Sequence, residues 1–132
     1  MKKPFLLIVL AFVISLPSHA QEECPIEFGN EDYMDKVTEL ILEAPSCYEA
    51  SNLVNACSMG ASGDAYMVGV TIKKCEKEIP KMSQKDSELY FELNAKCDKK
   101  YSKMRGTMYI SMNAFCHLPV TQLFIEWLRV EK

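Results

Sequence analysis

Histidine is scarce in this chain of 132 residues, in which only His19 and His117 occur. His19 lies in a segment that we expect to be removed on export, which leaves His117 alone. A single histidine excludes hydrolases that use a histidine pair for acid–base work, and it leaves a histidine-based zinc site short of ligands. We interpret His117, which lies between Cys116 and the pair Leu118 and Pro119, as a partly exposed residue near a turn.

Several sequence motifs of catalytic and ligand-binding sites are also absent. No two of the six cysteines have the Cys-x-x-Cys spacing of a zinc ligand pair or of a reactive dithiol. The phosphate-binding GxxxxGK, the nucleophile motif GxSxG and the zinc motif HExxH are also absent. We therefore expect neither catalytic residues nor a cofactor, and we predict that the protein is not an enzyme.

Long apolar runs are confined to the start of the chain. After an N-terminal lysine pair, an apolar stretch runs from Phe5 to Leu16, and small residues lead to Ala20. This order is typical of a bacterial secretory signal peptide, so we expect residues 1–20 to be removed. The apolar stretch is shorter than the ~20 residues that span a bilayer as a helix. We expect a periplasmic or secreted product without a membrane or lipid anchor, in which residues 21–132 form one domain.

The charge of the mature chain is acidic. Loss of residues 1–20 removes Lys2 and Lys3 but no acid, which leaves 13 basic and 18 acidic residues and a net charge of −5. An acidic protein is a poor ligand for nucleic acid, so we expect a protein partner instead. The same charge suits a cationic partner and also serves ordinary solubility.

The six cysteines predict a disulfide framework, because an even number in a small exported domain is typical of one. In an antiparallel helical hairpin, residues equally far from the turn lie side by side. Cys47 lies 13 residues before Gly60, and Cys75 lies 12 residues after Gly63, at the two ends of one expected turn. These two cysteines should therefore face each other.

The same count pairs two later cysteines. Cys97 lies nine residues before Gly106, and Cys116 lies ten residues after it. The two remaining cysteines then form the third bridge. The predicted disulfides are Cys24–Cys57, Cys47–Cys75 and Cys97–Cys116.

Apolar residues three and four apart predict helices in the first half of the mature chain. Residues 30–44 have this spacing and should form a helix that Pro45 ends. Ser46 and Asp64 are suited to cap a second and a third helix. The third also alternates as a strand would, and Pro80 should stop it in either case.

The second half has equally clear helix signals. Ser83 followed by Asp86 resembles a capping box and opens a long helix that should end near Gly106. Residues 107–116 should form a further helical segment, and Pro119 is suited to the first turn of a last helix. The predicted fold is an all-α, disulfide-stapled bundle of five to six helices.

A run of sulfur side chains offers one alternative function. Met104, Met108, Met112 and Cys116 follow one another at intervals of four residues. Thioether and thiolate ligands suit Cu(I), so a periplasmic copper-handling protein with a metal site at Met108, Met112 and Cys116 is one hypothesis. Methionines at helical spacing also fill protein cores, and we expect that role here.

Two further chemical readings concern carboxylates and glycines. A carboxylate-based glycosidase needs an acid in an apolar setting, and Glu92 and Glu126 have the most apolar neighbours. The amides of residues 60–64 could form an anion site at a helix start. A turn followed by a helix cap explains the same residues, and we favour this structural interpretation.

The segment from Cys47 to Cys57, followed by Asp64 seven residues later, resembles the small helical periplasmic domain of the lysozyme-inhibitor (LprI-like) lipoprotein family. The resemblance covers about 20 residues and extends to Cys116 as a match for a later cysteine. The Trp and Arg that usually precede that cysteine are absent, and Trp127 follows it instead. The resemblance implies a disulfide-linked helical domain that blocks lysozyme. We therefore expect a non-catalytic binding module, an inhibitor of a cationic envelope-directed enzyme such as lysozyme.

Overall fold

The computed structural model describes residues 23–130, and within them it contains five α-helices and no strand. The predicted all-α class is confirmed, and the segment for which a strand was an alternative is helical. The signal peptide and its cleavage point lie outside the described residues. The helices are α1 (Tyr33–Glu43), α2 (Cys47–Ala56), α3 (Gly63–Glu76), α4 (Gln84–Tyr101) and α5 (Thr107–Val130).

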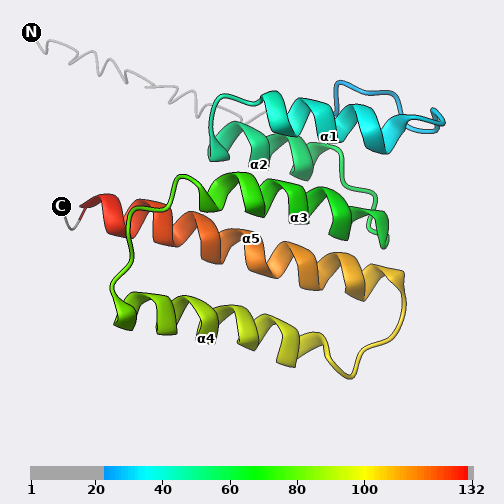
Figure 1. The fold of residues 1–132 in the computed structure, drawn as a ribbon. Coiled ribbons are helices and arrows are strands. Elements are labelled where there is room, and N and C mark those ends of the chain that lie inside the picture. The colour runs from blue at the N-terminus through cyan, green and yellow to red at the C-terminus, as the bar shows by residue number, and fades with distance from the viewer. Residues whose placement is uncertain (1–22, 131–132) are drawn as a thin grey trace, which may run out of the picture.

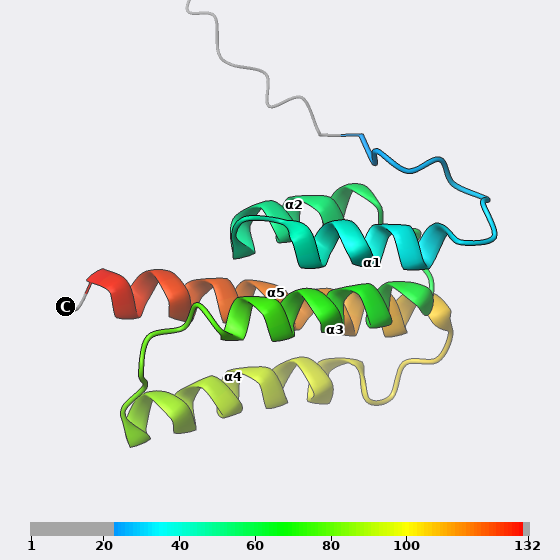
Figure 2. The ribbon, with the colours of Figure 1, turned by 45° about the horizontal axis from the view of Figure 1, so that its top comes forward.

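The helices form three layers (Figure 1). The antiparallel pair α1 and α2 packs mainly on α3, with a small contact between α2 and α5, and α4 lies along the other side of α5. The turned view in Figure 2 gives the same order, with α1 and α2 above and α4 below the central pair. The α1–α2 pair and the α4–α5 connection therefore lie at different edges of the molecule.

Two apolar clusters hold these layers together. The larger one lies between α1, α2, α3 and α5 and includes the fully buried Val37 and Ile41. The smaller one joins α4 to α5, where Phe124 packs edge-on against Tyr90 and Trp127 with ring centroids 5.1 and 5.4 Å away. Burial of each large apolar side chain contributes about 1.5–3 kcal/mol, so these clusters are the main source of stability.

Local signals define several helix ends as predicted. The Ser46 side chain accepts hydrogen bonds from the Tyr48 and Glu49 amides and caps α2. Ser83 and Asp86 form the expected capping box at the start of α4. Each such cap satisfies amides that the first turn of a helix leaves without a partner.

Two predicted helix boundaries are wrong. Asp64 does not cap α3, which begins one residue earlier at Gly63 and has Ser62 at its cap position. Pro119 does not open a new helix but lies inside the 24-residue α5. Buried Leu118 and Thr121 lie on either side of it and pack against neighbouring helices, which maintains the helix despite the missing amide donor.

Three disulfides bridge the elements, and they are the three pairs expected from the sequence. Cys24–Cys57 ties the N-terminal segment to the end of α2, with 4.8 Å between the Cα atoms. The other two bridges, with Cα atoms 4.7 and 5.7 Å apart, join α2 to α3 and α4 to α5. The described cysteines are all paired, so every layer is linked covalently to a neighbour.

Candidate functional site

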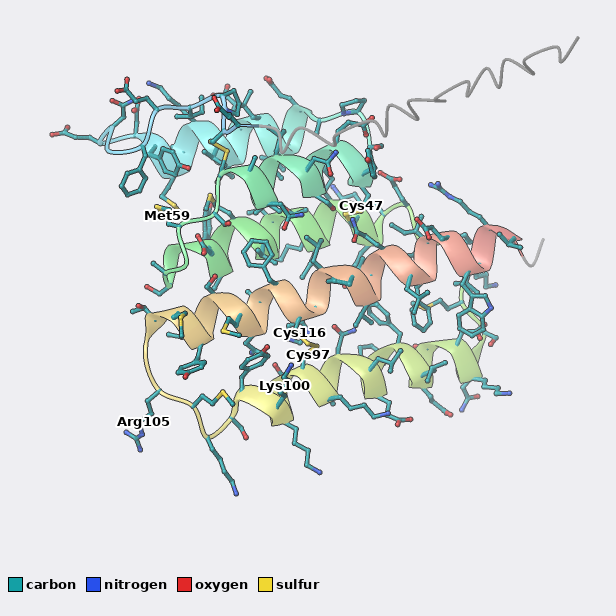
Figure 3. The ribbon with its side chains drawn as sticks, turned by 180° about the vertical axis from the view of Figure 1, so that it is seen from behind. Cys47, Met59, Cys97, Lys100, Arg105 and Cys116 are labelled. Carbon is teal, nitrogen blue, oxygen red and sulfur yellow. A yellow bond between two sulfur atoms is a disulfide. The ribbon has the colours of Figure 1, made fainter. Side chains whose placement is uncertain are left out.

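A polar cluster surrounds the disulfide between α4 and α5, whose two cysteines are labelled in Figure 3. His117 of α5 faces α4 with both ring nitrogens: Nδ1 lies 2.7 Å from Oδ1 of Asn94, and Nε2 lies 3.0 Å from Oδ1 of Asp98. The amide of Asn113 donates to the same Asp98 oxygen at 3.1 Å. Two hydrogen-bonding residues from each helix thus flank one disulfide.

The four residues of the cluster come from two copies of a five-residue pattern, which helix and turn signals along the chain do not reveal. Residues 94–98 read Asn-Ala-Lys-Cys-Asp, and residues 113–117 read Asn-Ala-Phe-Cys-His. Because the two helices are antiparallel, each asparagine lies opposite the last residue of the other copy. The signal was therefore present in the sequence, but it depends on the Cys97–Cys116 pairing to bring the two copies together.

The hydrogen bonds of the cluster leave His117 without a free nitrogen. The side-chain NH2 group of Asn94 donates to the Tyr90 carbonyl at 2.9 Å. This hydrogen bond turns the side-chain oxygen of Asn94 towards His117. Hydrogen bonds from Asn113 and His117 lower the pKa of the Asp98 carboxyl, against the opposing effect of burial. His117 lies inside α5 rather than near a turn, and both of its ring nitrogens contact side chains of α4.

The loop between α2 and α3 is organised by one buried carboxylate. Asp64 accepts the amides of Met59, Gly60 and Ala61 at 2.8–3.2 Å and the Ser111 hydroxyl at 2.6 Å. The amide-lined anion site considered from the sequence is therefore filled by the protein's own Asp64. This residue, part of the resemblance, ties the loop to α5.

The copper hypothesis loses one of its three ligands. Cys116 is bonded to Cys97, so its sulfur has no thiolate to offer. Met108 and Met112 are about half-exposed on α5, and the described residues contain no group of three histidine, cysteine or acidic side chains that could hold a metal. The prediction that these methionines fill the core is wrong, since both face solvent.

The two carboxylates considered for glycoside hydrolysis also lie at the surface. Glu92 forms an ion pair with Lys96 at 2.9 Å, and its hydrogen bond to that lysine lowers its pKa. A general acid needs the opposite shift. Glu126 is exposed on α5.

The acidic side chains are concentrated on the α1–α2 pair. Residues 23–56 carry eight acidic residues, all exposed, and a single base, Lys36. Asp35, Glu39 and Glu43 follow at intervals of four along the outer side of α1. We call these eight residues the acidic face. Its members are Glu23, Glu27, Glu31, Asp32, Asp35, Glu39, Glu43 and Glu49.

Exposed apolar side chains accompany the acidic face. Phe28, Leu42 and Tyr48 come from the same segment, and each exposes more than half of its surface, but Leu42 lines a pocket with Lys73, Lys74 and Lys77, which leaves Phe28 and Tyr48 beside the acids. An area that combines like charges with large apolar groups is suited to protein contact rather than to solubility alone.

Comparisons with known proteins found no matching family model, no matching curated protein and no matching solved structure. Among the described residues, no helix is both long and apolar enough to cross a membrane.

Proposed function

We propose that this protein is a non-catalytic binding module of the periplasm or the extracellular space, and that it captures a cationic protein on its acidic face. The observation that carries the proposal is the placement of eight exposed acids and one lysine on residues 23–56. Residues 57–130, by contrast, carry 11 basic and eight acidic residues. The negative charge of the described residues is thus concentrated in the N-terminal segment, α1 and α2.

Charge on one surface steers the approach of an oppositely charged partner. Such steering speeds association and weakens as salt rises, because exposed charges are screened beyond a Debye length of about 10 Å at 0.1 M salt. Phe28 and Tyr48 supply the apolar contact area that a purely electrostatic encounter lacks.

The scaffold supports a role in recognition. The disulfides Cys24–Cys57 and Cys47–Cys75 hold both ends of α2 and the segment before α1, so the acidic face is presented on a braced surface. A rigid surface loses less conformational entropy on binding. Disulfides also suit an oxidising compartment outside the cytoplasm.

Lysozyme is the first cationic partner to test, because the segment from Cys47 to Asp64 resembles the lysozyme-inhibitor family. The test measures association of the oxidised protein with lysozyme at low and high salt, together with lysis of cell walls. We expect binding that weakens with salt and a matching loss of lysis. If lysozyme neither binds nor loses activity, it is not the partner.

Matched variants locate the binding surface. The triple variant Asp35→Asn, Glu39→Gln, Glu43→Gln removes three charges from α1 whose side chains form no ion pair with a described residue, and it should slow association about tenfold. The control, Glu88→Gln, Glu92→Gln, Glu126→Gln, makes the same change in net charge on α4 and α5. Equal effects of the two variants would show that only net charge matters and would contradict the proposed face.

A further inference from the structure

The last turns of α4 and the connection to α5 have a charge opposite to that of the protein as a whole. Residues 96–105 contain five basic residues and one acid, Asp98, and all six are exposed. Lys96 pairs with Glu92, whereas the other four bases form no ion pair with a described residue. We call these four the basic tip: Lys99, Lys100, Lys103 and Arg105. Lys100 and Arg105 are labelled in Figure 3, at the end of α4 and in the connection.

Large apolar side chains surround the basic tip. Met104 lies within it, and Met108 and Ile110 lie in the first turns of α5; about half of each side chain is exposed. Met112 continues the exposed row one turn further along α5. Lysine and methionine both have long unbranched side chains, which adapt to an irregular surface.

Packing beneath these apolar groups is incomplete. A cavity of about 240 Å³ lies between the end of α4 and the start of α5, and Met104 and Ile110 are part of its lining. Tyr101 and Tyr109 form other parts of the wall. The tip is therefore not a closed core, and its apolar side chains have contacts to gain elsewhere.

We propose that the basic tip and the methionines around it dock on the surface of an anionic lipid bilayer. The lysines and the arginine would lie against phosphate headgroups, and Met104 and Met108 would enter the boundary with the acyl chains. Basic side chains next to exposed apolar groups are the combination that gives interfacial binding. The tip is the end of the α4–α5 hairpin, at one end of the molecule (Figure 2).

The charge distribution also sets an orientation. The acidic face lies on the α1–α2 layer, and α4 lies at the opposite side of the molecule (Figures 1 and 2). The segment before α1, which carries four of the acids, lies at the same end of the molecule as the α4–α5 connection (Figure 1). An anionic surface repels the acids and attracts the basic tip, so a docked protein turns the α4 side of this end towards the bilayer and the α1–α2 layer away from it. Lipid docking and capture of a cationic protein therefore use separate surfaces.

The test is sedimentation of the oxidised protein with vesicles of phosphatidylcholine alone and with about 30 per cent phosphatidylglycerol, at low and near-physiological salt. We expect binding to the anionic vesicles only, falling as salt rises. The quadruple variant Lys99→Gln, Lys100→Gln, Lys103→Gln, Arg105→Gln should weaken this binding at least a hundredfold, at about fivefold for each base. Absence of binding to the anionic vesicles would overturn the proposal.

A control variant separates the effect of the tip from the effect of net charge. The variant Lys73→Gln, Lys77→Gln, Lys81→Gln, Lys85→Gln makes the same change in net charge at exposed lysines elsewhere and should retain most of the binding. If it loses as much as the tip variant, the proposed surface is wrong.

The apolar part has its own control. Met104→Ser with Met108→Ser should weaken binding several-fold at any salt concentration, whereas Leu123→Ser, at an exposed position far along α5, should not. Circular dichroism of each variant is the check that it is folded. Tip-dependent binding to an acidic protein or to nucleic acid, without binding to vesicles, would also overturn the lipid assignment.

Discussion

The carboxylate of Asp64 and the hydroxyl of Ser111 lie 2.6 Å apart across 47 residues of sequence. Asp64 is fully buried at the start of α3, and Ser111 is buried in the first half of α5. This hydrogen bond connects the loop after α2 to the start of the last helix.

Asp64→Ala should be among the most destabilising single substitutions. It leaves three partly buried loop amides and the buried Ser111 hydroxyl without their acceptor; a fully buried unsatisfied group costs about 1–3 kcal/mol, and a partly buried one costs less. We expect a loss of more than about 3 kcal/mol in urea unfolding. Ser111→Ala removes one donor and should cost less than half as much. Similar losses for both variants would mean that the loop amides do not depend on Asp64.

Removal of the Cys97–Cys116 bridge should cost about 2–5 kcal/mol, as for other native bridges in small exported domains. The measurement is the melting temperature of Cys97→Ser with Cys116→Ser under oxidising conditions. The double variant avoids a free thiol. If its melting temperature equals that of the unaltered protein, the bridge contributes nothing to stability.

Asp98 should make stability fall at acid pH. Its pKa is lower in the folded protein, so its contribution is present above the ordinary pKa of 3.8 and disappears as the pH falls further. Because the side chain is mostly exposed, we expect less than about 1 kcal/mol. Asp98→Asn should flatten the dependence of stability on pH below 4. If the free energy of unfolding of Asp98→Asn falls below pH 4 as steeply as that of the unaltered protein, the hydrogen bonds of Asp98 do not have this role.

Tyr90 should make stability fall at alkaline pH. Burial raises its pKa above the ordinary value of 10.0, so the neutral phenol stabilises the folded state below pH 10 and this contribution is lost as the pH rises through the raised value. Its hydroxyl contacts Glu76 and Thr121, both at 3.0 Å. Tyr90→Phe should cost about 1–2 kcal/mol at pH 7 and a smaller amount above pH 10. A constant difference across this range would contradict the prediction.

The features that the sequence predicts are those that depend on neighbours along the chain. The caps at Ser46 and Ser83 need only the next two or three residues, and they occur as expected. The disulfide pairs follow from distances to turns, because antiparallel helices place equidistant residues opposite each other. Local chemistry and hairpin geometry are thus enough to predict the overall architecture.

The features that the sequence does not predict depend on tertiary contacts. A local reading makes Asp64 a helix cap, but its hydroxyl donor comes from Ser111 on another helix. Pro119 has a typical position for a helix start, yet packing on both sides holds it inside α5. His117 finds both of its partners on α4. For Pro119 and His117 the deciding groups are distant in sequence, whereas three of the four donors to Asp64 lie within five residues of it.

The matching residues 94–98 and 113–117 give the α4–α5 pair a local twofold relation, with the disulfide near its axis. If α4 and α5 exchanged places in this region, each asparagine would still lie opposite the last residue of the other copy. The cluster therefore does not distinguish α4 from α5. It determines register, since a slip of one residue would break the disulfide and all three hydrogen bonds that cross between the helices. Which of the two helices enters the centre of the bundle is decided by the apolar side chains that α5 turns towards α3.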